Sequence, residues 1–146
     1  MKDYNTLQST IDKVVGKIGL GHTIELLETF IGNTSIKHST PEKIKLLSHY
    51  IITLAIQHFD LSEQLFFVNA KQEYRDARMC CFYLLRKYTQ DSYPKIGLAF
   101  RTSERTVEYG CAKVSERIEA PKGNAGFVAR FIAIETGLLE FITKIN

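Results

Sequence analysis

The sequence predicts an all-α protein. Apolar residues recur every three or four positions along most of the 146-residue chain, glycine or proline stands at the breaks, and almost no segment alternates apolar and polar residues as a strand would. Hydrophobic residues make up 45% of the chain, which is ordinary for a packed globule. The length predicts one domain, with an N-terminal helical extension at 1–40, a core at 41–118 and a last helix at 125–144.

Two helices are expected in the N-terminal extension. The first ends at Gly19 and Gly21, and the second runs from about 22 to 31. The polar residues 34–40 then connect the extension to the core. The apolar face of the first helix comprises Leu7, Ile11, Val14, Val15 and Ile18.

The core is expected to begin with two long helices joined by a short one. Thr40, Pro41 and an acid in the first turn mark the start of the first helix, which should run to about 59. A short helix follows at 60–67. The long helix at 72–88 turns these residues inward: Ala77, Cys80, Cys81, Leu84 and Leu85. Its two adjacent cysteines lie about 100° apart, so one is expected in the core and the other at its edge.

The next two helices have the spacing of a helix-turn-helix. A short helix over 92–100 is joined by a tight two-residue connection to a second helix over 103–118. Gly97 has no side chain and would let the two helices approach closely. Ser103 would cap the second helix and leave its first amides pointing toward a backbone phosphate. The outer face of such a second helix can enter a major groove of DNA.

The last helix, expected at 125–144, carries a wide apolar stripe: Phe127, Phe131, Ile134, Leu138, Phe141 and Ile142. This is more apolar surface than a helix with one solvated face usually has. Either the N-terminal helices at 7–31 cover the stripe, or it forms a homodimer with a second copy.

Positive charge is concentrated in one third of the chain. Residues 71–118 hold 10 Lys/Arg and 6 Asp/Glu, which gives a net charge of +4. Residues 1–70 have a net charge of −1, and residues 119–146 have a net charge of zero. Lysine and arginine bind nucleic acid by displacing condensed counterions, so this distribution is typical of a phosphate-binding surface. A solvated basic face is the alternative interpretation.

We expect neither an enzyme nor a bound metal or cofactor. The four histidines are scattered without Cys or Asp at ligand spacing, and no nucleophile arrangement or carboxylate pair stands out. Three cysteines, two of them adjacent, do not suggest a disulfide framework. No apolar run approaches the ~20 residues of a membrane span, and the first five residues contain no signal core. A cytoplasmic protein without membrane contact is expected.

Three motifs resemble one known family. They are I-T-L-A-I-Q-H-F-D-L at 52–61, A-R-M at 77–79 and P-K-I-G-L-A-F at 94–100. Together they are similar to the C-terminal DNA-binding domain of the bacterial replication initiator DnaA, whose fold is related to that of the Trp repressor, over about residues 48–118. The S-E-R-T-V-E run at 103–108 also resembles the helix-turn-helix of sigma-factor region four and of response regulators.

The resemblance has departures. Where the family has the recognition signature D-H-T-T-V, this chain has S-E-R-T-V at 103–107, and the family's glycine-rich turn is shortened to Arg101-Thr102. The family's basic loop, which reaches a minor groove, corresponds here to residues 69–75 with fewer cations. No segment resembles the family's ATPase domain, so we expect a protein that is not an initiator by itself.

The resemblance and the local charge favour a sequence-specific binder of double-stranded DNA that regulates transcription or replication. On the second helix, Arg105 and Lys113 are expected to reach guanine edges or phosphates. The other expected contacts on this helix are Thr106 to a phosphate, Glu108 to a cytosine amine and Tyr109 to the sugar-phosphate backbone.

Further DNA contacts are expected beside this helix, from Lys71, Arg75, Arg78, Lys95, Arg101 and Ser103. Of these, Lys71, Arg75 and Arg78 would form a flanking clamp. Three other cations are expected to be solvated surface residues: Arg86, Lys87 and Arg117.

The alternative is an interaction or assembly protein, such as one derived from a phage, that keeps the fold without binding DNA. Glu104 and Glu108 motivate it, because they would repel phosphates from the leading edge of the second helix. The altered turn before Ser103 also motivates this alternative.

Overall fold

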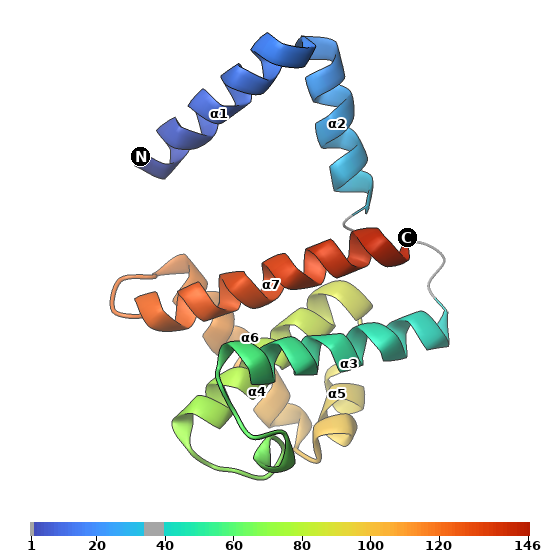
Figure 1. Cartoon of the computed structure of the whole chain (residues 1–146). Helices are drawn as coiled ribbons and strands as arrows, with labels where there is room; N and C mark the ends of the chain where they lie inside the picture. The colour runs from blue at the N-terminus through green and yellow to red at the C-terminus, as the bar shows by residue number, and fades with distance from the viewer. Residues whose placement is uncertain (1, 34–39) are drawn as a thin grey trace. The chain divides into compact units, whose positions relative to one another are not determined.

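Figure 1 shows the computed structural model of the chain, in which residues 2–33 and 40–146 are described. These residues form seven α-helices and one short 3-10 helix and contain no strand, so the all-α class is confirmed. The chain divides into two compact units, Met1–Ser35 and Ile36–Asn146, which we describe separately. That they make up the single domain expected from the length stays a prediction. None of the described helices is both long and apolar enough to cross a membrane.

The first unit consists of α1 (Lys2–Ile18) and α2 (Leu20–Asn33), which meet at Gly19. Gly19 has φ +87°, a backbone conformation that glycine adopts without a steric cost. The hydroxyl of Thr23 donates a hydrogen bond to the carbonyl oxygen of Gly19 at 2.7 Å. The break expected around two glycines is therefore made by Gly19 alone, and Gly21 lies inside α2. The connection expected at 34–40 lies outside the described residues except for Thr40.

The second unit begins with α3 (Pro41–His58), capped as expected by Thr40. The hydroxyl oxygen of Thr40 accepts a hydrogen bond from the backbone N–H of Lys43 at 3.2 Å. The short helix expected at 60–67 is wrong in extent, because only the 3-10 turn η1 (Glu63–Leu65) forms there. Asp60, two residues after the end of α3, has φ +53°, which does not continue an α-helix, and Phe66 is buried in the core.

The central helix of this unit is α4 (Gln72–Thr89), which packs against α3 on one side and α6 on the other. All five residues expected on its inner face are buried. The expectation that Cys80 and Cys81 would differ in burial is wrong, because both are fully buried. A helix covered on two sides buries an arc wider than the about 100° that separates neighbouring residues.

The last helix, α7 (Ala125–Ile145), lies against α3 (Figure 1). Phe127, Phe131, Ile134, Leu138 and Ile142 are buried, as their spacing predicts. Helix α3 of the same unit packs against this stripe, and a homodimer through α7 stays a prediction. A Cβ on Gly137 would lie 3.1 Å from the side chain of Leu54 on α3, and the rings of Tyr50 and Phe141 stack at 4.0 Å.

The expected helix-turn-helix is present as α5 (Tyr93–Phe100) and α6 (Glu104–Glu119). Ser103 caps α6, because its hydroxyl oxygen accepts a hydrogen bond from the backbone N–H of Thr106 at 3.1 Å. A Cβ on Gly97 would lie 2.8 Å from the carbonyl oxygen of Thr102. Gly110 brings α6 equally close to α4, since its Cβ would lie 2.8 Å from the ring of Phe82. The two glycines thus allow α6 to lie close to both neighbouring helices.

Candidate nucleic-acid interface

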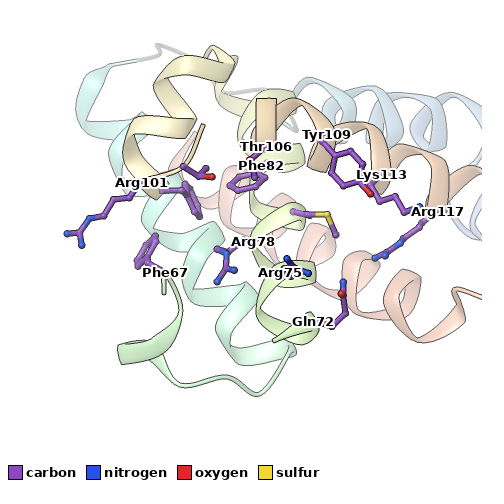
Figure 2. A pocket seen from close by; sticks show the side chains of 13 residues that line it. Phe67, Gln72, Arg75, Arg78, Phe82, Arg101, Thr106, Tyr109, Lys113 and Arg117 are labelled. Carbon is purple, nitrogen blue, oxygen red and sulfur yellow. The ribbon is translucent and has the colours of Figure 1, made fainter. Parts of the chain in front are cut away.

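A groove of about 470 Å³ lies between the N-terminal half of α4 and one flank of α6 (Figure 2). The loop after η1 and the C-terminal end of α5 border it. We call it the basic groove, and its lining residues are Phe67, Gln72, Arg75, Arg78, Met79, Phe82, Phe100, Arg101, Thr102, Thr106, Tyr109, Lys113 and Arg117. Five of these described residues are arginine or lysine, and none is acidic. Such a surface attracts an anion.

One flank of α6 supplies an ordered row of side chains to the groove. Thr106, Tyr109, Lys113 and Arg117 follow one another at intervals of three or four residues, so they lie one above another on the helix. Figure 2 shows Tyr109 and Lys113 on this wall, with Arg75 and Arg78 on the facing α4 wall. The polar groups of the two helices therefore face a common space.

Glu108 lies on the other flank of α6, beside a second hollow. The cations of that hollow have protein partners, because Arg86 donates to the carbonyl oxygen of Asp91 at 3.0 Å and Lys87 pairs with Glu135 at 2.8 Å. Arg86 and Lys87 are both exposed, as expected for surface residues. The structure thus places the carboxylate of Glu108 away from the basic groove.

Arg117 is largely buried, so the expectation of a solvated side chain is wrong. Its guanidinium pairs with the carboxylate of Asp76 at 3.0 Å, and the two side chains are only 17% and 18% exposed. It also lies over the ring of Phe127, 4.6 Å from the centroid. The side-chain amide of Gln72 donates to the same Asp76 oxygen at 2.8 Å. Arg117 therefore ties α6 to α4 and α7, and its charge is largely compensated.

Arg78 is half-buried and positions the loop at the end of the groove. Its guanidinium donates a hydrogen bond to the backbone carbonyl of Phe66 at 2.7 Å. Burial, together with the nearby guanidinium of Arg75, lowers the pKa of Arg78. Since arginine stays charged in proteins, two like charges share this wall at an electrostatic cost that a bound anion would relieve.

Arg75 and Arg101 are exposed cations of the groove whose side chains make no hydrogen bond or ion pair with the described residues. Arg101 ends α5 with φ +55°, in the left-handed region that favours glycine. Figure 2 shows its guanidinium extending outward from the rim of the groove. Both residues therefore present a charge that is available to a partner.

Of the eleven residues expected to contact DNA, six line the basic groove: Arg75, Arg78, Arg101, Thr106, Tyr109 and Lys113. Their contact with DNA stays a prediction. Sequence reasoning missed the groove's Gln72 and Phe67 as well as the location of Arg117. Helical spacing could have indicated two of them, because residues three or four positions apart lie on the same side of a helix. Gln72 is three positions from Arg75, and Arg117 is four positions from Lys113.

The other five expected contacts lie outside the groove. Lys71 and Arg105 are exposed, at the start of α4 and α6 respectively. Lys95 pairs with Asp91 at 3.1 Å. The hydroxyl of Ser103 is engaged by the backbone N–H of Thr106 and lies 2.9 Å from the Thr106 hydroxyl. Glu108 lies on the opposite flank of α6, as described above.

The described residues hold no group of metal-ligating side chains, and their cysteines are buried. No cluster of three or more His, Cys, Asp or Glu among them could hold a metal ion. Burial raises the pKa of Cys111 to about 11 and raises those of Cys80 and Cys81 as well. Their thiols therefore stay protonated and poorly nucleophilic at neutral pH.

Residues 48–114 match the family of the bacterial dnaA protein helix-turn-helix. The segment includes every residue of the basic groove except Arg117. Two relatives are the chromosomal replication initiator proteins DnaA of Nostoc sp. and Trichormus variabilis, each 34% identical over 84 residues. These alignments cover 56% of this chain and 18% of each relative.

The DnaA protein of Synechocystis sp. is 36% identical over 77 residues, which are 51% of this chain and 17% of that protein. The chain thus spans less than a fifth of the length of these relatives. No solved structure matches the chain significantly. Residues 48–114 are a DnaA-type C-terminal helix-turn-helix domain, and the chain is homologous to the initiator DnaA over about half of its length.

Proposed function

We propose that this protein binds double-stranded DNA through the basic groove and the exposed face of α6, and acts in replication or in the regulation of transcription. The observation that carries the proposal is the set of five arginine and lysine residues that line one groove beside the helix-turn-helix, without an acidic residue among the described lining. The names of the relatives, which are replication initiators, support the same conclusion. A DNA partner implies a cytoplasmic location.

The contacts divide by role. Arg75 and Lys113 face each other across the groove and each bind one backbone phosphate, while the outward-extending Arg101 binds a third. Arg105 is exposed in the first turn of α6, where side chains of a recognition helix reach base edges. The groove thus supplies affinity, and the start of α6 supplies sequence preference.

The binding of a random-sequence duplex at increasing salt tests this function. If about three phosphates are contacted, the logarithm of the association constant falls with the logarithm of the salt concentration with a slope of about −3. Arg105→Ala leaves that slope nearly unchanged but weakens the binding of sequences chosen by selection from random oligonucleotides. Failure of the wild-type chain to bind any duplex at low salt contradicts the proposal.

A second candidate is an interaction or assembly protein that keeps the fold without binding DNA. The exposure of Glu104 and Glu108 on α6 favours it, since both carboxylates repel phosphates. A homodimer through α7, on which Ile132 is exposed, belongs to the first candidate, because two helix-turn-helix units could bind two half-sites of DNA. Light scattering after size-exclusion chromatography distinguishes the two, because a large assembly that is insensitive to salt and free of nucleic acid favours the second candidate.

A further inference from the structure

Four aromatic side chains line the basic groove together with its cations. Phe67, on the loop after η1, and Tyr109, on α6, are 40% and 64% exposed and lie on opposite sides of the groove (Figure 2). Phe100 and Phe82 also line the groove and are buried. The ring centroids of Phe67 and Phe100 are 5.3 Å apart, and those of Phe82 and Phe100 are 5.0 Å apart. The groove therefore offers ring faces as well as positive charge.

The exposed ring of Phe67 is held in place rather than loosely attached. It makes an edge contact with the buried ring of Phe66 at 5.1 Å, and Arg78 binds the backbone carbonyl of Phe66. A ring that is fixed beside a groove loses little conformational entropy when a ligand packs against it. The loop after η1 thus presents a preformed apolar edge next to Arg78.

The size and chemistry of the groove fit a single nucleotide. Pockets that hold small ligands measure about 300–1,000 Å³, and this groove has about 470 Å³. Proteins that bind unpaired nucleic acid combine a cationic groove for the backbone with aromatic rings on which bases stack. A paired duplex presents base edges in its grooves and hides the base faces, so it could not use the rings.

We propose that the basic groove holds an unpaired nucleotide of a DNA strand, with its base stacked on Tyr109 or Phe67 and its phosphate at Arg75 and Arg78. The inference rests on the proposed DNA binding and adds the class of DNA that fits this groove best. The protein then prefers a duplex that contains an unpaired base over a fully paired one, because the paired duplex must first unstack a base before the rings can contact it.

Affinity for three fluorescently labelled DNAs tests this inference on the full chain at one salt concentration. They are a paired duplex of random sequence, the same duplex with one extra unpaired 2-aminopurine nucleotide, and the corresponding single strand. The bulged duplex is expected to bind about 10-fold more tightly than the paired duplex, which is the effect of one stacked base. Stacking on a ring should also change the 2-aminopurine fluorescence.

Matched variants assign the effect to the rings. Tyr109→Ala and Phe67→Ala are expected to reduce the preference for the bulged duplex, whereas Tyr109→Phe keeps the ring and the preference. Tyr4→Ala is the control, since Tyr4 on α1 is 62% exposed and does not line the groove. Thermal melting checks that each variant is folded.

Equal affinity for the paired and bulged duplexes, or a preference that survives in the Tyr109→Ala/Phe67→Ala double variant, overturns the inference and leaves the proposed function intact. Binding of free deoxyadenosine monophosphate as tightly as the bulged duplex also overturns it, because the site would then serve a free nucleotide. Absence of binding to every DNA overturns the inference and the proposed function together.

Discussion

Replacing Arg101 with glycine should make the helix-turn-helix more stable and its binding to DNA weaker. Arg101 has φ +55° and ψ 43°, the left-handed conformation, at the end of α5. This conformation costs a residue with a Cβ about 1–2 kcal/mol. Glycine avoids that cost but raises the entropy of the unfolded chain, which offsets about 0.4–1 kcal/mol of the gain.

The net gain in the free energy of unfolding is therefore about 0.5–1 kcal/mol. For a chain of this length the melting temperature rises by about 2–3 °C. The backbone hydrogen bonds of the turn are kept, including the one from the Thr102 N–H to the carbonyl oxygen of Gly97 at 2.9 Å. Loss of the Arg101 charge removes one phosphate contact and flattens the salt dependence of DNA binding by about 0.9.

Two further variants separate conformation from charge. Gln90→Gly relieves the same left-handed strain, φ +60° at the end of α4, without removing a charge, so it should gain similar stability and bind DNA like the wild type. Arg101→Ala removes the charge and keeps the strain. Urea unfolding and fluorescence anisotropy with a labelled duplex measure the two effects. A loss of stability in Arg101→Gly beside a gain in Gln90→Gly would contradict the role of the left-handed conformation. Equal DNA binding by the two glycine variants would contradict the role of the Arg101 charge.

Three other perturbations test the packing around the groove. Gly97→Ala should lower the free energy of unfolding in urea by about 1–3 kcal/mol, because the added Cβ would clash with the backbone of the turn. Gly126→Ala should be neutral or stabilising, because a Cβ there would have no atom within 4 Å. Equal effects of the two substitutions would contradict the close approach at Gly97. Asp76→Asn should lower the free energy of unfolding by about 1–2 kcal/mol, because it leaves Arg117 without its ion pair. An unchanged melting curve would contradict a stabilising role of this ion pair. Iodoacetamide at pH 8 should leave Cys111 nearly unlabelled in the folded chain and should label it after unfolding. Burial raises the pKa of Cys111 to about 11, so that roughly one thiol in a thousand is ionised at pH 8. Rapid labelling of Cys111 in the native protein would contradict this.

Elements with local signals could be predicted from the sequence. Thr40, Ser92 and Ser103 each cap the helix that follows, because a hydroxyl at that position accepts a backbone N–H three residues later. Gly97 could be assigned to a close approach because the helix-turn-helix geometry requires one at that position. These features depend on a few neighbouring residues.

Features that depend on residues distant in the chain could not be predicted. Asp76 and Arg117 are 41 positions apart, and only the packing of α4 against α6 brings them together. The packing of α3 on the apolar stripe of α7 could not be predicted, because the sequence does not show that α3 has apolar surface for both α4 and α7. The phenylalanines of the groove could not be predicted for the same reason, since Phe67 approaches Phe100 only after the loop folds.

The most direct test of DNA binding through the basic groove is the salt dependence of duplex affinity in two double variants. Arg75→Gln/Lys113→Gln removes two cations of the groove, and Lys45→Gln/Lys144→Gln removes two exposed cations outside it. The first pair should flatten the logarithmic salt slope by about 2, while the second pair should leave the slope within experimental error of the wild type. Equal slopes for the two double variants would contradict the assignment of the groove as the DNA-binding surface.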